Sequence, residues 1–282
     1  VRSGLKPLRQ LAQRIASRPA GASTPVQVER LYAETAPLVQ ELNALLAREA
    51  LRLEAERRFL ADAAHELRTP LAAVNAQAHL LMSEEEAPAR AEAAAALRSG
   101  IARVSHLLAQ LLTLARAETA NVVLKPERLD AAALLRERVA LLAPLARQRG
   151  IELALQAPPQ LVAMLERSGF CSIVDNLVDN AIRYTQAGGR VEVELQLQAG
   201  QDLSLAVRDN GCGIAPAQRE RVFERFYRVP GSTEEGTGLG LAIVKRIAER
   251  GNAALAFGTG LDGRGTGLHL RWPGAAPSEQ PG

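Results

Sequence analysis

The stretch FLADAAHELRTPL, residues 59–71, places a histidine where it can do chemistry. Glu66 directly follows His65, and Thr69 lies one helical turn further along the same face. Neutral imidazole has a free lone pair near pH 7, so His65 can act as a nucleophile. A neighbouring carboxylate can hold the proton on the other ring nitrogen, an assistance worth roughly 10²- to 10⁴-fold. Thr69 can orient a water molecule for the reverse, hydrolytic step. An isolated His-Glu pair is more often an ordinary surface feature, so the downstream segments decide its meaning.

The segment DNLVDNAIRYT carries groups that suit a nucleotide and its metal. Asn176 and Asn180 are four residues apart and share a helix face, with Arg183 and Tyr184 one turn further along. Amide oxygens are suitable ligands for Mg²⁺, which also takes water and phosphate oxygens. Arg183 can contact a phosphate, and Tyr184 can pack on a base. Asparagines on a helix are also commonly caps or hydrogen-bonded core residues, so this segment alone is not decisive.

The segment VRDNGCGI has the pattern of a strand that ends in Asp-x-Gly-x-Gly. Asp209 can accept a hydrogen bond from the amino group of adenine. Gly211 and Gly213 allow the backbone to approach a ligand closely. Because Asp-Asn-Gly also forms an ordinary turn, this pattern is weak evidence when taken alone.

The segment GTGLGLAIVKRIAE is a glycine-rich loop that opens directly into an amphipathic helix. Free amides and the helix dipole make such a start a favourable phosphate site, although glycine-rich loops are frequent. It lacks the Gly-Lys-Ser/Thr of a Walker loop. The preceding residues 221–235 are polar and long, which suits a mobile lid. Arg225 and Arg228 can reach phosphates from this lid, while Phe223 and Phe226 anchor it to the core.

A helical hairpin is predicted to position His65. Its first helix continues past Pro70, which predicts a bend rather than a stop. Residues 83–92 predict a loop before the second helix. One hairpin cannot bury its apolar stripe, whereas two copies can pair as a four-helix bundle with His65 facing solvent. The first helix repeats every seven residues at Leu46, Leu53, Leu60, Leu67, Val74 and Leu81, and four residues later at Ala50, Arg57, Ala64, Leu71 and Ala78; the second helix carries Leu97, Ile101, Val104, Leu108 and Leu111.

The remainder of the chain alternates short strands with helices, which predicts helices layered on a sheet. The predicted strands cover residues 122–124, 151–155, 191–197 and 203–208, and the predicted helices cover 130–149, 169–186 and 239–250. At the beginning of the chain, residues 5–17 predict an amphipathic helix, followed by a connector rich in Pro, Gly, Ser and Thr. The Pro/Gly-rich tail after Pro273 predicts disorder.

Composition limits the functional classes. The 282 residues are 47% apolar and 23% charged, which indicates a globular chain with room for two domains. A net charge of +3, scattered arginines and 3% aromatic residues disfavour nucleic-acid binding. Cys171 and Cys212 form neither a metal motif nor a disulfide framework, which fits a reducing compartment. No apolar run is long enough to span a bilayer, so any membrane segment is expected upstream of Val1.

Together these motifs resemble the sequence boxes of the bacterial sensor histidine kinases of two-component signalling. The resemblance rests on the His65 segment, the Asn180 helix, Asp209-x-Gly211-x-Gly213, the Phe/Arg segment and Gly236-x-Gly238-x-Gly240, in that order, and covers about residues 5–273. It implies a multidomain α and α+β fold, in which a dimeric four-helix-bundle hairpin precedes an α/β-sandwich ATP-binding domain similar to that of gyrase B, MutL and the heat-shock chaperone ATPases. The implied domains are a HAMP-like signal-relay segment (1–53), the histidine phosphotransfer hairpin (54–119), the ATP-binding domain (120–273) and a disordered tail (274–282).

The resemblance also implies roles for individual residues. His65 is the phospho-acceptor, Glu66 is its acid/base partner and Thr69 supports phosphatase activity. Asn180 is the implied Mg²⁺ ligand, with Asn176 as a second contributor. The residues expected to bind ATP are Asn176, Asn180, Arg183, Tyr184, Asp209, Gly211, Gly213, Arg225, Arg228, Gly236, Gly238, Gly240 and Leu241.

We therefore expect ATP-dependent autophosphorylation of His65, phosphotransfer to an aspartate of a response regulator, and regulator dephosphorylation. The expected protein is a homodimer, the cytoplasmic portion of a bacterial inner-membrane protein, with a hinge near residues 118–121. One alternative is an ATP-driven conformational machine of the same nucleotide fold without phosphotransfer. Those ATPases carry a catalytic glutamate where this chain has Asn176, which disfavours that alternative. A structural coiled-coil scaffold that binds no nucleotide is the other alternative.

Overall fold

The structure, a computed structural model, describes residues 36–84, 86–118, 125–198, 201–231, 234 and 236–275. The chain divides into two compact units, Val1–Thr69 and Pro70–Gly282. The helix predicted over residues 5–17, the connector after it and the strand predicted over 122–124 lie outside the described residues, as does most of the predicted hinge. No helix within the described residues combines the length and apolar character needed to cross a membrane.

Helix α2 spans Ala36–Ser83 and contains Pro70 in its interior, so the helix continues past the proline as its periodicity predicts. Proline has no backbone N–H, so the carbonyl group of Glu66 lacks its usual helical donor at that point. Leu67 and Val74 of the first heptad row are half-buried, whereas Leu60 of the same row is 60% exposed. Leu71 of the second row is 46% exposed. Arg57 and Ala64 of that row are exposed as well, whereas Ala50 and Ala78 are half-buried.

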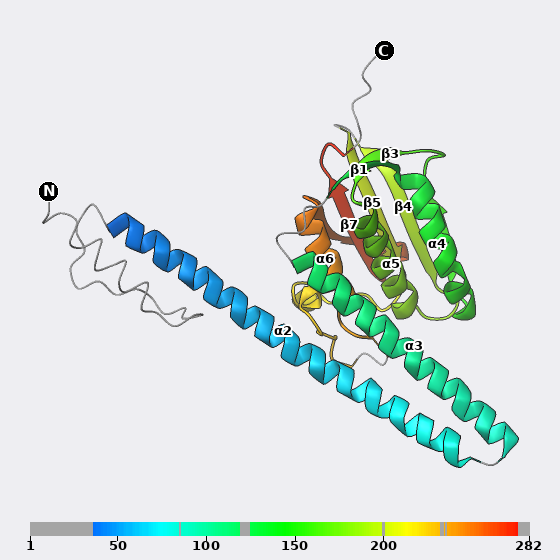
Figure 1. Ribbon diagram of the computed structural model, residues 1–282. Coiled ribbons are helices and arrows are strands. Elements are labelled where there is room, and N and C mark those ends of the chain that lie inside the picture. The colour runs from blue at the N-terminus through cyan, green and yellow to red at the C-terminus, as the bar shows by residue number, and fades with distance from the viewer. Residues whose placement is uncertain are drawn as a thin grey trace, which may run out of the picture. The chain divides into compact units, whose positions relative to one another are not determined.

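Helix α3 spans Ala87–Glu118 (Figure 1). The loop predicted over residues 83–92 is shorter than expected, because Pro88 belongs to the first turn of α3 rather than to the loop. Proline is tolerated in the first turn, where its missing N–H has no helical partner in any case. Gly100 is buried, and a Cβ built on it would lie 3.0 Å from Cγ2 of Val74. The absence of a side chain at Gly100 therefore lets α3 approach the final part of α2 closely.

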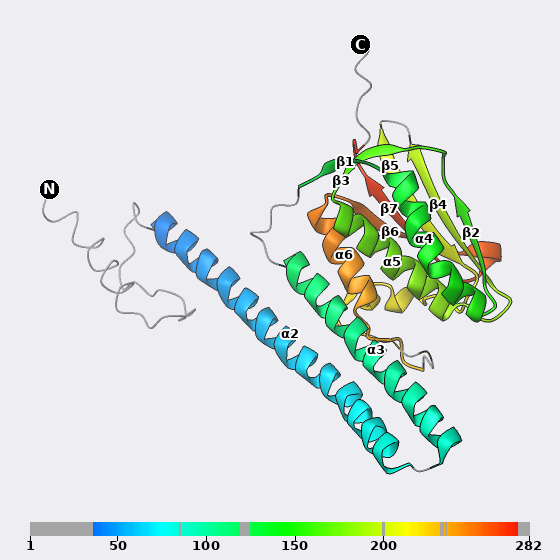
Figure 2. The ribbon, with the colours of Figure 1, turned by 45° about the vertical axis from the view of Figure 1, so that its right-hand side comes forward.

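The remaining elements form a two-layer domain of helices on a sheet, with a five-stranded sheet in the order β2-β4-β5-β7-β6 and a separate β1-β3 pair. Strand β2 runs parallel to β4, and all the other pairs are antiparallel. Figures 1 and 2 show α4, α5 and α6 gathered on one face of the sheet. The elements are β1 Glu127–Asp130, α4 Ala131–Gln148, β2 Glu152–Gln156, β3 Val162–Leu165, α5 Arg167–Tyr184, β4 Arg190–Gln198, β5 Asp202–Asp209, α6 Gly240–Arg250, β6 Ala254–Thr259 and β7 Thr266–Trp272, with 3₁₀ turns at Pro216–Gln218, Arg221–Phe223 and Leu261–Gly263.

The core of this domain lies between the sheet and its helices. Val193 of β4 and Leu205 of β5 are fully buried on the helix-covered side. Glu192 and Glu194, on the other face of β4, both pair there with Arg208. This alternation is the pattern of a sheet with one covered face. The sheet therefore fixes the strand ends against which the candidate site is built.

The predicted helices α4, α5 and α6 and the predicted strands β2, β4 and β5 are confirmed to within a few residues. Strands β1, β3, β6 and β7 were not predicted. The predicted disordered tail begins too early, because Ala275 is 7% exposed and its carbonyl oxygen accepts a hydrogen bond from the amide of Met164 at 2.7 Å. Packing against β3 thus keeps residues 274 and 275 with the domain.

Candidate active site

The candidate nucleophile His65 lies in α2, within the unit that ends at Thr69. Its side chain is exposed, as are those of Glu66 and Thr69, while Leu67 is half-buried. The imidazole therefore occupies the solvent-facing position that the heptad register predicts. Ala64, which the same register placed in the seam, is exposed in the single chain.

Helix α5 carries Asn176 and Asn180, and the side chains of both lie against the start of α6. Glu166 caps the helix, because its carboxylate accepts hydrogen bonds from the amides of Ser168 and Gly169. The opposite face of α5 is buried in the core, which fixes the rotation of the helix. A Cβ built on Gly240 would lie 3.1 Å from Oδ1 of Asn176 and 3.2 Å from Nδ2 of Asn180. Both amide groups therefore lie against the first turn of α6.

Asn176 has a fixed orientation. Its Nδ2 donates a hydrogen bond to the carbonyl oxygen of Ser172 at 2.7 Å, and its Oδ1 accepts one from Nε2 of Gln110 at 3.3 Å. Donor and acceptor are thus both used, and the acceptor is used by a residue of α3. Asn180, one turn later, lines the cavity described below.

Asp209 ends β5 as a buried carboxylate. It is 7% exposed, and its Oδ1 accepts hydrogen bonds from the amides of Gly211 at 2.9 Å and Thr266 at 3.1 Å. Burial raises the pKa of the Asp209 carboxyl above its ordinary value, and these two amides oppose that shift. A hydrogen-bond donor brought into the cavity would therefore meet an acceptor that water solvates poorly.

Two glycines of the site are required by close contacts. A Cβ at Gly211 would lie 2.3 Å from the carbonyl oxygen of Tyr184, and a Cβ at Gly238 would lie 2.6 Å from the carbonyl carbon of Phe226. Gly238 also has a φ of +67°, which L side chains rarely adopt. The amide of Phe226 donates to the carbonyl oxygen of Gly238 at 3.0 Å, so the lid segment braces the glycine-rich loop.

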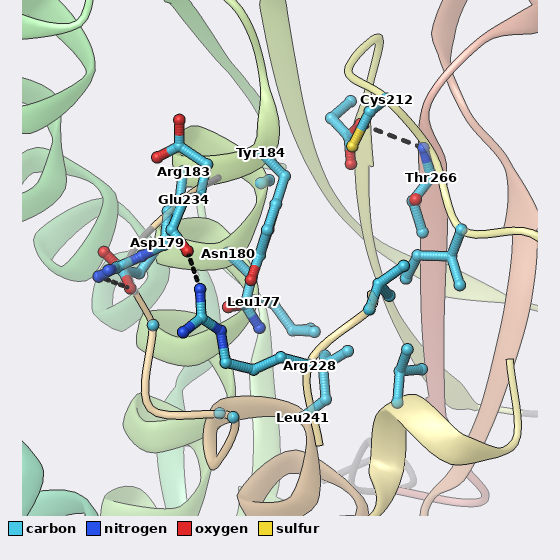
Figure 3. Close-up of a pocket in the computed structure, with 18 of the residues that line it drawn as sticks. Leu177, Asp179, Asn180, Arg183, Tyr184, Cys212, Arg228, Glu234, Leu241 and Thr266 are labelled. Atoms are coloured by element: carbon cyan, nitrogen blue, oxygen red, sulfur yellow. Dashed lines mark hydrogen bonds and ion pairs between the residues drawn. The ribbon is translucent and has the colours of Figure 1, made fainter. Parts of the chain in front are cut away.

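A cavity of about 550 Å³ joins α5, the end of β5, the lid and the start of α6. Figure 3 shows Asp179, Arg183 and Glu234 on one side of this pocket and Cys212 and Thr266 on the other. Most of the predicted ATP-binding residues line it, namely Asn180, Arg183, Tyr184, Asp209, Gly213, Arg228, Gly236, Gly238, Gly240 and Leu241. The lining thus combines a buried carboxylate at one strand end with cationic side chains and a glycine-rich helix start.

The predicted residues Asn176, Gly211 and Arg225 are not in the cavity lining. Asn176 lies against Gly240 and Gly211 lies against the backbone of Tyr184, so each contacts a residue that lines the cavity. Arg225 instead forms an ion pair with Glu118 at the end of α3. An acidic side chain thus holds the guanidinium of Arg225 in this structure, and its contact with phosphates stays a prediction.

The lid is held by a small group of charged contacts around Glu234. Arg149 donates to a carboxylate oxygen of Glu234 at 2.9 Å, and Arg228 donates to its backbone carbonyl oxygen at 2.6 Å. Arg183 pairs with Asp179 on the same helix at 2.9 Å. Arg183 and Arg228 can exchange these partners for an anionic ligand, since both line the cavity.

Sequence reasoning missed two residues of α3. His106 and Gln110 line the cavity, and Gln110 also accepts a hydrogen bond from the hydroxyl of Thr237 at 2.6 Å. Nothing in the helical pattern distinguishes these residues from other polar residues of an amphipathic helix. Thr237, between two glycines of the loop, carried a clearer signal, because its neighbours were already predicted to bind phosphate.

Comparison with family models divides the chain into three matches. Residues 5–51 match the HAMP domain of PhoQ-like sensor proteins, residues 55–120 match the His Kinase A phospho-acceptor domain, and residues 166–276 match the ATPase family of histidine kinases, DNA gyrase B and HSP90. His65 falls in the second match, and most of the cavity lining falls in the third.

Whole-chain relatives agree with these matches. The chain is 40% identical to the swarming motility regulation sensor protein RssA of Serratia marcescens, over 95% of this chain and 57% of RssA. It is 38% identical to the sensor protein kinase PmrB of Pseudomonas aeruginosa, over 98% of this chain and 58% of PmrB. The chain thus spans somewhat more than half the length of these relatives.

Solved structures give the same result. The crystal structure of full-length ShkA in complex with AMPPNP aligns with a TM-score of 0.56 and 30% identity, over 78% of this chain and 46% of that one. The histidine kinase AdeS of Acinetobacter baumannii aligns with a TM-score of 0.59 and 22% identity, over 74% of this chain and 97% of that one. The second likeness concerns the fold alone.

Proposed function

We propose that this chain, which belongs to the two-component sensor histidine kinases, uses ATP to phosphorylate His65 and passes the phosphoryl group to an aspartate of a response regulator. The observation that carries the proposal is the cavity itself, where the buried Asp209 faces the same space as Asn180, Arg183 and the glycine-rich start of α6. The exposed imidazole of His65 supplies the acceptor.

Asp209 selects adenine in this proposal. An ionised carboxylate accepts a hydrogen bond from the exocyclic amino group of adenine, and guanine offers an acceptor oxygen at the same place. The amides of Gly211 and Thr266 hold one carboxylate oxygen in position. Leu268 and Val207 line the cavity as apolar neighbours, which suits a flat aromatic base.

The phosphates lie toward the opposite end of the cavity, at Gly236, Gly238 and Gly240. The first amides of α6 are free of helical partners, and the helix dipole favours negative charge there. Arg183 and Arg228 add positive charge from the neighbouring α5 and lid. Positioning and electrostatic stabilisation of this kind supply most of the acceleration in phosphoryl transfer.

Asn180 would hold Mg²⁺, with Asn176 beside it. The fit is supported by two amide groups that face the first turn of α6, next to the proposed phosphate site. No group of three or more His, Cys, Asp or Glu side chains suitable for a metal occurs within the described residues, so phosphate and water oxygens would complete the shell. When bound, Mg²⁺ offsets the charge of the phosphates.

The chemical step is a transfer in which one bond forms and one breaks. A ring nitrogen of His65 bonds to the γ-phosphorus of ATP, and the bond from that phosphorus to the bridging oxygen breaks, so that ADP leaves with the electron pair. Glu66 holds the proton on the other ring nitrogen and stabilises the developing positive charge. Thr69 orients water for the hydrolytic step in which a phosphorylated regulator loses its phosphate.

A homodimer is the proposed assembly. Ile101, Leu108 and Leu112 of α3 are about half exposed, which leaves an apolar row uncovered in the single chain. A second copy of the hairpin would cover such a row in a four-helix bundle.

We also infer that the chain is the cytoplasmic part of a membrane-anchored sensor, because its relatives are sensor proteins that extend beyond the matched region.

The test is incubation of the protein with γ-labelled ATP, followed by location of the label. The wild-type protein should take up an acid-labile, base-stable label, and His65→Gln should take up none while it binds AMPPNP normally. A label of that kind in His65→Gln would refute the assignment of His65. Steady phosphate release without any protein label would instead support the ATPase alternative.

A further inference from the structure

The nucleotide cavity has a free thiol in its wall. Cys212 follows Asp209 by three residues, and its side chain is exposed and lines the cavity. Figure 3 shows Cys212 on the same side of the pocket as Thr266. The proposed function places adenine at this end, because Asp209 accepts a hydrogen bond from its amino group. A group attached to the sulfur of Cys212 would therefore extend into the space proposed for the base.

A buried hydroxyl group without a partner lies beside this thiol. Thr185 is 5% exposed and lines the same cavity, and its Oγ1 has no hydrogen-bond partner among the described residues. Its methyl group faces Gly189, outside the cavity lining, because a Cβ built there would lie 2.3 Å from Cγ2 of Thr185. The amide of Cys212 donates to the carbonyl oxygen of Tyr184 at 3.4 Å, which keeps the two segments together. Buried polar groups normally have partners, so this hydroxyl is available to a ligand of the cavity.

Cys171 provides a contrast within the same chain. It lies in α5, is half-buried and does not line the cavity. Burial raises the pKa of the Cys171 thiol above its ordinary value, because the charged thiolate is desolvated. The thiolate is the reactive form, so Cys171 should react slowly with thiol reagents. Cys212 is therefore the cysteine that a reagent in solution reaches first.

We propose that Cys212 is a modification site that forms a mixed disulfide with a low-molecular-weight disulfide, and that the adduct excludes ATP from the cavity. This inference rests on the proposed function. The Cys212 thiol loses its proton to water, and its sulfur attacks one sulfur of the disulfide. A new S–S bond forms, the original S–S bond breaks, and the other half of the reagent leaves as a thiolate with the electron pair. Cys212 is oxidised and the leaving half is reduced, so an excess of free thiol reverses the reaction.

The surroundings of Cys212 suit a peptide-like adduct that carries carboxylates. Arg183 and Arg228 line the same cavity and attract negative charge. The hydroxyl of Thr185 can donate a hydrogen bond to a carbonyl or carboxylate oxygen of the adduct. Glutathione disulfide offers both kinds of oxygen and is the probe for the test. The consequence is mutual exclusion, in which nucleotide protects the thiol and the adduct blocks nucleotide, so His65 is labelled only while Cys212 is reduced.

The experiment follows adduct formation and nucleotide binding in the same protein. The wild type is incubated with glutathione disulfide, with and without saturating Mg-AMPPNP, and the adduct is located by mass mapping of peptides. Binding of Mg-AMPPNP is measured by calorimetry before treatment, after treatment, and after reduction with excess free glutathione. We expect the adduct at Cys212 rather than at Cys171, and protection of Cys212 by Mg-AMPPNP. Binding should become undetectable after treatment and return after reduction.

Three variants assign the effect to single groups. Cys171→Ser keeps Cys212 and should lose Mg-AMPPNP binding on treatment, as the wild type does. Cys212→Ser should bind Mg-AMPPNP equally before and after treatment, each sample being compared only with its own untreated state. Thr185→Val keeps the shape of the side chain and removes the hydroxyl. The ratio of glutathione disulfide to glutathione needed for half modification of Thr185→Val should rise about 2- to 10-fold, because the adduct loses one hydrogen bond.

Four results would overturn the proposal or one of its parts. Absence of the adduct from Cys212, whether or not Cys171 is modified, would remove the site. An adduct at Cys212 that leaves Mg-AMPPNP binding unchanged would show that the cavity holds both. Loss of binding in treated Cys212→Ser would move the effect to another group, and an unchanged ratio in Thr185→Val would remove its hydroxyl from the adduct.

A failure of the proposed function looks different. The untreated wild type would then fail to bind Mg-AMPPNP or to take up label from γ-labelled ATP, while glutathione disulfide would still modify Cys212.

Discussion

At the scale of single residues, the proposed function assigns the choice of ligand to the carboxylate of Asp209. Replacing it with asparagine keeps an oxygen for the amides of Gly211 and Thr266, at the positions where Oδ1 now accepts them. It also turns the remaining acceptor into a donor, which would face the amino group of adenine. We expect Asp209→Asn to weaken ATP binding by about 10- to 100-fold, measured by calorimetry. Binding that is unchanged would remove Asp209 from adenine recognition.

The raised pKa of Asp209 gives a second prediction at this scale. The folded-state pKa lies above the unfolded value of about 3.9, so between the two the folded protein binds more protons. Stability contributed by this carboxyl therefore falls as pH rises through that window. Compared with Asp209→Asn, which does not titrate, the wild type should lose relative stability from about pH 4 upward. Thermal unfolding of both proteins over a pH series tests this, and a constant difference in Tm would contradict it.

Nucleotide binding should show the opposite dependence on pH over the same window. The amino group of adenine needs the ionised acceptor, so ATP affinity of the wild type should increase as Asp209 loses its proton. Asp209→Asn should lack that component. The two measurements thus separate the cost of burying the charge from its use in recognition.

The sequence predicts which residues lie together when those residues are also close to one another along the chain. Asp209, Gly211 and Gly213 lie within five residues, so one strand end positions them together. Gln110 could not be found in this way, because its partners lie 66 and 127 residues away. The ion pair of Arg225 was not predictable for the same reason, since its partner Glu118 lies at the end of α3, far away in the sequence.

At the scale of elements, the length of an amphipathic pattern decided what could be predicted. Helices α4, α5 and α6 have 18, 18 and 11 residues and strong caps or glycine starts, and all were found. Strands β1 and β3 have four residues each, too few for an alternating pattern. In β6 and β7, Gly258 and Gly267 face each other, which weakens the pattern although Leu268, Leu270 and Trp272 alternate correctly.

The α2–α3 approach at Gly100 gives a prediction at the element scale. Alanine in a helix is favoured over glycine by about 1 kcal/mol, but a Cβ here would lie 3.0 Å from Cγ2 of Val74. We expect Gly100→Ala to be about neutral in the free energy of unfolding, because crowding offsets the propensity gain. In a Val74→Ala background the same change should stabilise by about 1 kcal/mol. Denaturant unfolding of all four proteins completes this cycle, and equal effects of Gly100→Ala in both backgrounds would show that the two side chains do not interact.

At the scale of the whole molecule, α3 contacts two different surfaces. The row Leu107, Leu111 and Leu114 is buried, and α3 packs on α6 of the ATP-binding domain, while the row Leu108 and Leu112 is left about half exposed. A helix with apolar residues around much of its circumference needs more than one packing partner. One helix can therefore contact the ATP-binding domain and still present an apolar row to the partner copy that we propose, whereas its pattern in the sequence predicted a bundle alone.

The exposed row provides the last prediction. Each leucine that a partner buries contributes about 1.5–3 kcal/mol, and in a two-fold symmetric dimer each substitution counts twice. Leu108→Gln combined with Leu112→Gln should therefore raise the Kd of the homodimer by several orders of magnitude, measured by sedimentation or light scattering over a dilution series. Leu141→Gln, at a 60% exposed position of α4, is the matched control and should leave the dimer intact. AMPPNP affinity should remain unchanged in both proteins, because neither substitution alters a residue of the cavity. A double variant that dimerises like the wild type would place the dimer contact on another surface of the chain.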